Sequence, residues 1–312
     1  MKNIKYILLL LVVVSQFACI TDPLKEIEEG DWNNERSIIN IKLENQVGKA
    51  IIERVDDQTG TIVLAINVGA VPDLSNIKLS SLQLSYGAVS SVKVGESFNF
   101  ENATNTATMT VTSPTGKSRE YTITATSFTE TLLGTYKIAN LTVYGGTGPE
   151  YGGAAVMAMM SKSWLWSATD GPGAELDNTL TFTLTGITED GNTYGKVVNN
   201  AGTDGLYANF IYNRDPITDV NHHYRRIPKG EGEWSRNYTT GTITFTFPDG
   251  KTTACTYVGA GVEDMGYNKS KTTTDNAFRF TLSGTDDWGK IYSDYDKFVK
   301  RPRVLWVDVK KQ

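Results

Sequence analysis

Apolar and polar residues alternate with a period of two along most of the chain after Ser37. The alternation recurs over residues 39–43, 62–68, 180–184, 243–247, 278–282 and 305–309. A period of two places one side of a strand in a core and the other in water. Helical periodicity is confined to residues 294–300, a short stretch that Pro302 ends. The pattern therefore predicts an all-β protein.

Residues 35–128 combine short predicted strands with turns rich in Asp, Pro and Gly, such as 56–60 and 113–117. About seven strands in under a hundred residues match the size and strand spacing of an immunoglobulin-like sandwich. The Cys–Trp–Cys pattern of antibody domains is absent from this stretch. We therefore expect an Ig-like β-sandwich on strand count and spacing alone.

A new strand pattern begins near residue 129 and runs to the C-terminus. We expect a larger antiparallel β domain over residues 129–312, and two architectures fit it. A jelly-roll sandwich accommodates the length and the long loops. A closed calycin-like barrel is the alternative, because Gly134-Thr135-Tyr136 resembles the Gly-x-Trp opening of lipocalins, with Tyr in the Trp position. The jelly roll is the favoured prediction.

The N-terminus has the composition of a secretory signal. Lys2 and Lys5 precede an apolar run over residues 6–14, and Ala18 precedes Cys19. The run is shorter than the roughly 20 residues that span a bilayer. The stretch resembles the bacterial lipoprotein signal, which implies cleavage before Cys19 and lipid attachment to its thiol. In such signals the third residue before the cysteine is usually aliphatic, and here it is Gln16. The alternative is an ordinary secreted protein.

Residues 19–34 are acidic and lack apolar patterning. Such a segment cannot bury enough surface to offset its ordering entropy, so we expect a flexible tether. An acidic tether after a lipidated cysteine resembles the export signal of Bacteroidetes surface lipoproteins. The resemblance implies a protein anchored by lipid in the outer membrane and exposed at the cell surface.

Charge and cysteine content exclude several classes of function. The formal net charge is −5, and Lys and Arg form no continuous stripe, so nucleic acid is not an expected partner. With Cys19 lipidated, Cys255 has no disulfide partner and is expected to be a buried apolar residue of a strand. His222 and His223 would point to opposite sides of a strand, and we expect no metal or other cofactor.

The second domain contains five of the six tryptophans, and polar residues follow several of them. An exposed aromatic ring covers the flat C–H face of a sugar, while polar side chains bind its hydroxyl groups. Trp164 and Trp166, two apart on a predicted strand, are expected to share a side. The candidate glycan-binding residues are Trp164, Trp166, Asp170, Trp234, Arg236, Asn237, Asp286, Asp287, Trp288 and Tyr292.

A tryptophan in a β domain is also a common core residue. We favour the core interpretation for Trp166 and for Trp306, which lies in a regular terminal strand. Trp234 and Trp288 lie beside Gly, Asp and Ser in predicted loops, where exposure and burial are evenly balanced.

Enzyme motifs are not evident in the sequence. The carboxylate pairs are neighbours along the chain, whereas glycosidases bring two carboxyl groups about 5–10 Å apart from different strands. The chain has no Gly-x-Ser-x-Gly elbow, phosphate loop or dinucleotide fingerprint. We therefore expect no enzymatic activity.

The predicted layout is a lipid anchor, an acidic tether, an Ig-like domain and an aromatic-rich β domain. This layout is similar to that of the surface glycan-binding lipoproteins of starch-utilisation-type systems in Bacteroidetes. The resemblance implies a spacer role for residues 35–128 and capture of a carbohydrate near an outer-membrane importer. A fimbrial or adhesin-type structural subunit and a glycoside hydrolase are the alternatives.

Overall fold

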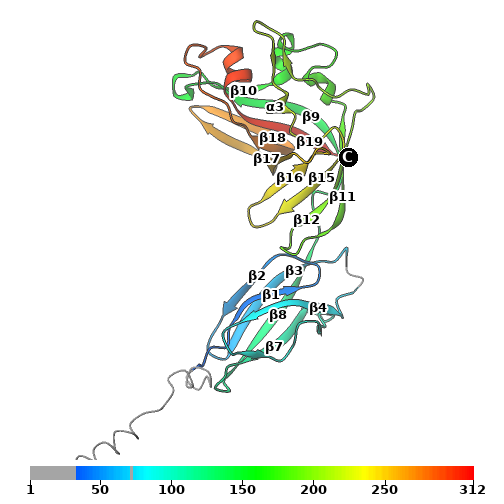
Figure 1. The fold of residues 1–312 in the computed structure, drawn as a ribbon, viewed down its shortest axis with the longest axis vertical. Helices are drawn as coiled ribbons and strands as arrows, with labels where there is room; N and C mark the ends of the chain where they lie inside the picture. The colour runs from blue at the N-terminus through cyan, green and yellow to red at the C-terminus, as the bar shows by residue number, and fades with distance from the viewer. Residues whose placement is uncertain (1–32, 71–72) are drawn as a thin grey trace, which may run out of the picture. The chain divides into compact units, whose positions relative to one another are not determined.

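The computed structural model describes residues 33–70 and 73–312 (Figure 1). The predicted signal peptide, Cys19 and nearly all of the tether lie outside the described residues. The described chain forms two compact units, residues 33–44 with 50–127 and residues 128–312 with 45–49. Both units are built from strands, so the predicted all-β class is confirmed. No helix among the described residues is long and apolar enough to cross a membrane.

The first unit contains two sheets with a shared core. One sheet has the strand order β1 (Ile38–Leu43), β4 (Ile77–Leu84) and β6 (Ser97–Phe98). The other has the order β2 (Gln46–Arg54), β3 (Thr59–Asn67), β8 (Ser118–Phe128), β7 (Thr106–Thr112) and β5 (Val89–Ser90). Most of the alternating residues predicted to face inward do so, and their side chains pack in one cluster that includes Ile41, Leu64, Leu79, Val111 and Ile123. Ile39 and Val68 are exceptions, because both are exposed.

The second unit contains an eight-stranded barrel. Its strands follow one another in chain order and pair antiparallel: β9 (Gly134–Gly145), β11 (Thr179–Ile187), β12 (Thr193–Asn200), β15 (Gly230–Asn237), β16 (Thr242–Thr246), β17 (Thr252–Gly266), β18 (Lys269–Thr281) and β19 (Pro302–Lys311). The last strand returns to the first, from Lys311 opposite Tyr136 to Val304 opposite Tyr144. This strand order is that of a closed barrel and not of the favoured two-sheet jelly roll.

Large aromatic side chains fill the inside of the barrel. Tyr136, Phe182, Trp234, Phe245 and Phe278 are almost completely buried and belong to one cluster. An eight-stranded barrel is just wide enough for its inward side chains to fill it, and these rings do so. Each such ring stabilises the fold by about 1.5–3 kcal/mol. Any ligand site of this unit must therefore lie on its outside or at an end.

The connections at one end of the barrel carry its short helices. Between β9 and β11 lie η1 (Pro149–Tyr151), β10 (Ala155–Ala158), η2 (Met159–Leu165) and η3 (Pro172–Glu175). Between β12 and β15 lie β13 (Ile211–Tyr212), β14 (Thr218–Asp219) and α3 (Asn221–Tyr224). The helical turn predicted near Asp294 is the short helix η4 (Asp296–Lys300), which ends just before β19.

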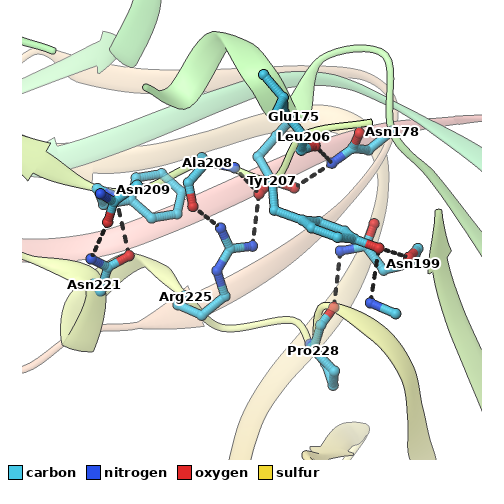
Figure 2. A network of polar contacts seen from close by, with 12 residues as sticks. Glu175, Asn178, Asn199, Leu206, Tyr207, Ala208, Asn209, Asn221, Arg225 and Pro228 are labelled. Atoms are coloured by element: carbon cyan, nitrogen blue, oxygen red, sulfur yellow. Dashed lines mark hydrogen bonds and ion pairs between the residues drawn. The ribbon is translucent and has the colours of Figure 1, made fainter. Parts of the chain in front are cut away.

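A buried ion pair holds the connection between β12 and β15 against η3 (Figure 2). The Glu175 carboxylate is nearly fully buried, and it accepts hydrogen bonds from Arg225 Nη1 at 2.7 Å and from the Ala208 N–H at 2.9 Å. Asn178 Nδ2 donates to its other oxygen at 3.1 Å. Further along, Tyr207 Oη donates to the Asn199 carbonyl at 2.6 Å. The connection is long and has little strand pairing of its own. These contacts fix the path of its backbone.

Candidate functional site

Trp166 and Trp234, both among the glycan-binding candidates, are core residues, which removes them from the candidate site. For Trp166 this is the core interpretation that the sequence favoured, and for Trp234 it decides between burial and exposure. The Trp234 ring lies inside the barrel, and its Nε1 donates to the carbonyls of Thr183 and Lys196, each at 3.1 Å. Trp166 is buried under the end of the barrel, edge-on to Tyr212, Tyr224 and Phe298. Neither indole has a face available to a sugar. Trp306 is fully buried, as the core interpretation predicted.

Three of the predicted polar residues have local structural partners. Arg236 Nη1 pairs with the buried Glu130 carboxylate at 2.8 Å. Asn237 Oδ1 accepts the N–H groups of Thr239 and Thr240 and so shapes the turn after β15. A hydrogen bond from Ser167 lowers the pKa of Asp170, whose carbonyl accepts the Asn209 N–H at 2.6 Å. None of the three adjoins an exposed tryptophan through a contact in the structure's described part.

The remaining aromatic candidates are exposed. The side chains of Trp288 and Tyr292 are 57% and 59% exposed, in the segment between β18 and η4. Tyr151, at the end of η1, is 65% exposed and joins them. We call these three residues the aromatic platform. Sequence reasoning missed Tyr151, although its position between Gly148 and Gly152 marks a turn that can carry an exposed side chain.

Direct contacts connect the three residues of the aromatic platform. The rings of Tyr151 and Trp288 are edge-to-face, with their centroids 6.0 Å apart. This geometry is favourable because the positive edge of one ring meets the negative face of the other. Tyr292 Oη donates to the Tyr151 carbonyl at 3.3 Å. Two loops that are far apart in the sequence therefore present one aromatic surface.

A glycine allows the two loops to approach closely. Gly148 has a φ of +59°, and a Cβ placed there would lie 3.1 Å from Trp288 and from Ile291 and 3.2 Å from Tyr151. Any larger residue would strain the backbone and displace the rings of the aromatic platform.

Buried polar contacts fix the same loops from below. Asp296 is fully buried, and its carboxylate accepts the Thr147 N–H at 2.6 Å and the Thr147 hydroxyl at 2.8 Å. The Thr147 hydroxyl in turn accepts the Asp287 N–H at 2.8 Å, next to Trp288 in the chain. The chain of contacts from Asp296 through Thr147 to Asp287 therefore sets the position of one loop against the other.

Two arginines at the start of β19 engage Asp286. Its Oδ1 lies 2.8 Å from Arg301 Nε and 3.2 Å from Arg303 Nη2. Arg303 Nε also donates to the Gly146 carbonyl at 2.9 Å. Asp286 is thus committed to holding its loop, whereas Asp287 is half-buried with one oxygen accepting the Gly289 N–H.

Trp164 lies at the end of η2 and is 53% exposed. Lys162 Nζ lies 5.1 Å from the centre of its ring and 3.3 Å from Asp294 Oδ2. Lys297 Nζ donates to the Tyr292 carbonyl at 2.7 Å, and burial lowers the pKa of Lys297. The lysines and Asp294 connect Trp164 with the loop of the aromatic platform. Because Trp164 and Trp166 lie on and after a 3-10 helix, they do not share a side as a strand would require.

The histidines and Cys255 do not extend this site. His222 and His223 lie on the short helix α3 and not on a strand, with ring centres 3.9 Å apart. Burial, together with His222 and Arg226, lowers the pKa of His223 to about 4. Cys255 is buried inside the barrel, and burial raises the pKa of its thiol. Within the described residues, no three His, Cys, Asp or Glu side chains are grouped to hold a metal ion.

No protein-family model matches the chain, and no curated protein matches its sequence.

Proposed function

We propose that the second unit binds carbohydrate on the aromatic platform. The observation that carries the proposal is the exposure of three large rings that neighbouring contacts hold in a fixed arrangement. A soluble protein buries such rings where it can, and a rigid exposed group of them marks an interaction surface. A sugar fits this surface because its C–H face covers an aromatic ring.

The polar surroundings of the rings favour a sugar over a wholly apolar ligand. Glu150 is exposed and precedes Tyr151 in the chain, and Lys290 is exposed two residues after Trp288. Asp287 has one carboxylate oxygen that can accept a hydrogen bond from a sugar hydroxyl. Carbohydrate recognition needs such a mixture of aromatic surface and hydrogen-bonding groups. The filled interior of the barrel directs binding to this outer surface.

The rest of the chain is consistent with presentation of the aromatic platform at the cell surface. We propose that Cys19 carries a lipid in the outer membrane, that residues 19–34 are a tether, and that residues 35–128 form an Ig-like spacer. The calycin-like barrel then exposes the aromatic platform at the cell surface, where a captured glycan is passed to an outer-membrane importer. This arrangement is similar to that of the surface glycan-binding lipoproteins of starch-utilisation-type systems.

The two alternatives have less support from the described residues. A fimbrial subunit accepts a donated strand at an open sheet edge, and the barrel instead pairs β19 with β9. A glycoside hydrolase needs two free carboxyl groups across its substrate. Asp286, Asp294 and Asp296 are engaged by an arginine, a lysine and a buried threonine respectively, which leaves Glu150 and Asp287 as the less engaged carboxylates beside the aromatic platform.

The test is a search for binding by the purified full-length protein. Electrophoresis in native gels that contain starch, β-glucan, xylan, mannan or mucin glycans should show retardation with at least one of them. Unchanged migration in every gel would contradict the proposal. Release of reducing sugar would favour the hydrolase, and a ladder of heat-stable oligomers on a denaturing gel would favour the fimbrial subunit.

A further inference from the structure

Strands β17 and β18 continue past the barrel as a two-stranded arm. β17 pairs with β16 only from Thr252 to Thr256, and β18 pairs with β19 only from Asn276 onward. Residues 260–275, which we call the arm, pair with each other across the hairpin. The two strands are visibly longer than β16 in Figure 1. A two-stranded ribbon is marginally stable alone, so its position depends on further contacts.

Two ion pairs fasten the arm to the outer wall of the barrel. Lys271 Nζ lies 2.9 Å from Asp308 Oδ1 of β19, and both side chains are largely buried. Glu263 pairs with Arg279 at 2.8 Å and accepts the Trp306 Nε1–H at 3.1 Å. Burying an ion pair costs desolvation energy and makes its geometry specific, so these contacts fix where the arm lies.

The end of the arm lies beside the loop that carries Tyr151. Met265 packs against a cluster that contains Tyr144, Ala154 and Trp306. Tyr144 and Ala154 are at the two ends of the loop over residues 145–153, and β18 contacts β10 just after it. The tip of the arm therefore adjoins the loop of the aromatic platform.

The tip presents another exposed ring at the cost of backbone strain. Tyr267 and Asn268 form a two-residue turn between the paired Gly266 and Lys269, with φ of +51° and +58°. Such turns favour Asn and Gly, because a larger side chain is strained at positive φ. Tyr267 is nevertheless 59% exposed at this position. Tyr292 of the aromatic platform has the same property, with a φ of +75°. Strained residues of this kind concentrate at binding sites.

We propose that Tyr267 is an additional aromatic subsite for the same ligand, and that the ligand is an extended chain of several sugar units. This inference rests on the proposed function. A chain that stacks on the aromatic platform reaches the tip of the arm with a later unit, whereas a monosaccharide contacts only one of the two places.

The test compares oligosaccharides of increasing length from the polysaccharide that gives the strongest gel retardation. Tyr267→Asn is the informative variant, because Asn adopts positive φ readily and removes only the ring. We expect it to weaken binding of the longest oligosaccharides about five- to tenfold and to leave the affinity for the disaccharide unchanged. Tyr267→Phe should restore the affinity, and Val262→Ala, which changes an exposed apolar residue of the same arm, should not alter it.

The outcomes separate the two proposals. If Tyr267→Asn binds every length as the unaltered protein does, while Trp288→Ala loses affinity, the subsite is refuted and glycan binding stands. An equal loss at all lengths also refutes it, because the ring then belongs to the same contact as the platform. If the unaltered protein binds none of the polysaccharides, both proposals fail.

Discussion

Glu130 is a buried carboxylate with four hydrogen-bond donors. It accepts the Leu132 N–H at 2.9 Å, the Thr193 hydroxyl at 2.6 Å and Arg236 Nη1 at 2.8 Å, and Tyr238 Oη also donates to it. Burial alone raises the pKa of Glu130, but the donors outweigh it, so the pKa lies below its usual value. This fully paired carboxylate connects the segment that precedes β9 to β12 and β15.

Glu130→Gln is expected to destabilise the protein by about 2–4 kcal/mol. The substitution removes the charge partner of Arg236, and it places an amide NH2 group, itself a donor, among the donors that surround the carboxylate. Urea denaturation at neutral pH measures the change. Glu233→Gln, an exposed change on β15, is the matched control and should shift stability by less than about 0.5 kcal/mol. Equal effects of the two substitutions would contradict the role given to Glu130.

His223 makes the stability depend on pH in a defined window. Its pKa is about 4 in the folded protein and about 6.5 when unfolded, so the unfolded chain binds more protons between these values. The stability that His223 contributes is therefore complete above pH 6.5 and is lost as the pH falls towards 4. Full loss amounts to about 3 kcal/mol.

Comparison of two variants isolates this effect from the titration of carboxylates. Urea denaturation at pH 7 and pH 4.5 should show a smaller pH dependence for His223→Gln than for the unaltered protein. His222→Gln removes a neighbour that also lowers the pKa of His223, so this variant should retain most of the pH dependence, because burial is the larger cause. An unchanged slope in His223→Gln would show that burial of this ring does not control acid stability.

At the scale of the elements, Thr147 joins the two loops of the aromatic platform without touching solvent. Thr147→Val keeps the shape but removes the hydroxyl, so Asp296 and the Asp287 N–H each lose a partner. We expect about a fivefold loss of glycan affinity, together with faster hydrogen exchange in residues 285–293. Thr147→Ser should restore both properties. If Thr147→Val lowers the melting temperature but leaves affinity and exchange of the loop unchanged, its role is in stability alone.

The strands themselves were predictable, but the closure of the barrel was not. Period-two alternation over residues 180–184 or 305–309 reports one buried side, and a sandwich and a barrel both require that. The difference lies in the pairing of β9 with β19, which joins the two ends of the unit. The residues of one strand do not show which distant strand pairs with it.

The tryptophans show why candidate residues were harder to predict than strands. Trp234 follows Gly230 and Gly232 at the inward positions of β15, and Gly195 lies opposite it. A Cβ on Gly195 would lie 3.0 Å from the indole nitrogen, so small residues make room for the ring and conceal the alternation. For Trp164 and Trp166, a 3-10 helix replaces the expected strand, and the two rings diverge. Contacts with a loop that is distant in the sequence hold the loop of Trp288 in place, so its exposure could not be predicted from the neighbouring residues.

At the scale of the whole molecule, we propose that a lipid anchor on Cys19 determines where the aromatic platform is displayed. Cys19 lies outside the described residues, and the proposal of its lipidation rests on the sequence pattern alone. Cys19→Ser should abolish incorporation of radiolabelled fatty acid and move the protein from the membrane fraction to the soluble fraction. Cys255→Ser is the control and should leave both properties unchanged. Unaltered labelling of Cys19→Ser would contradict the anchor.

The central claim is that the exposed rings bind sugar, and Trp288→Ala tests it most directly. The Trp288 ring is 57% exposed and lies in a loop, where it meets Tyr151 edge-to-face, so its loss should leave the barrel folded. Titration with the polysaccharide that retards the unaltered protein should show about a five- to thirtyfold weaker affinity, equivalent to about 1–2 kcal/mol. Tyr194→Ala, at an exposed ring on β12, should bind normally with the same melting temperature. Equal affinities of Trp288→Ala and the unaltered protein would contradict the account.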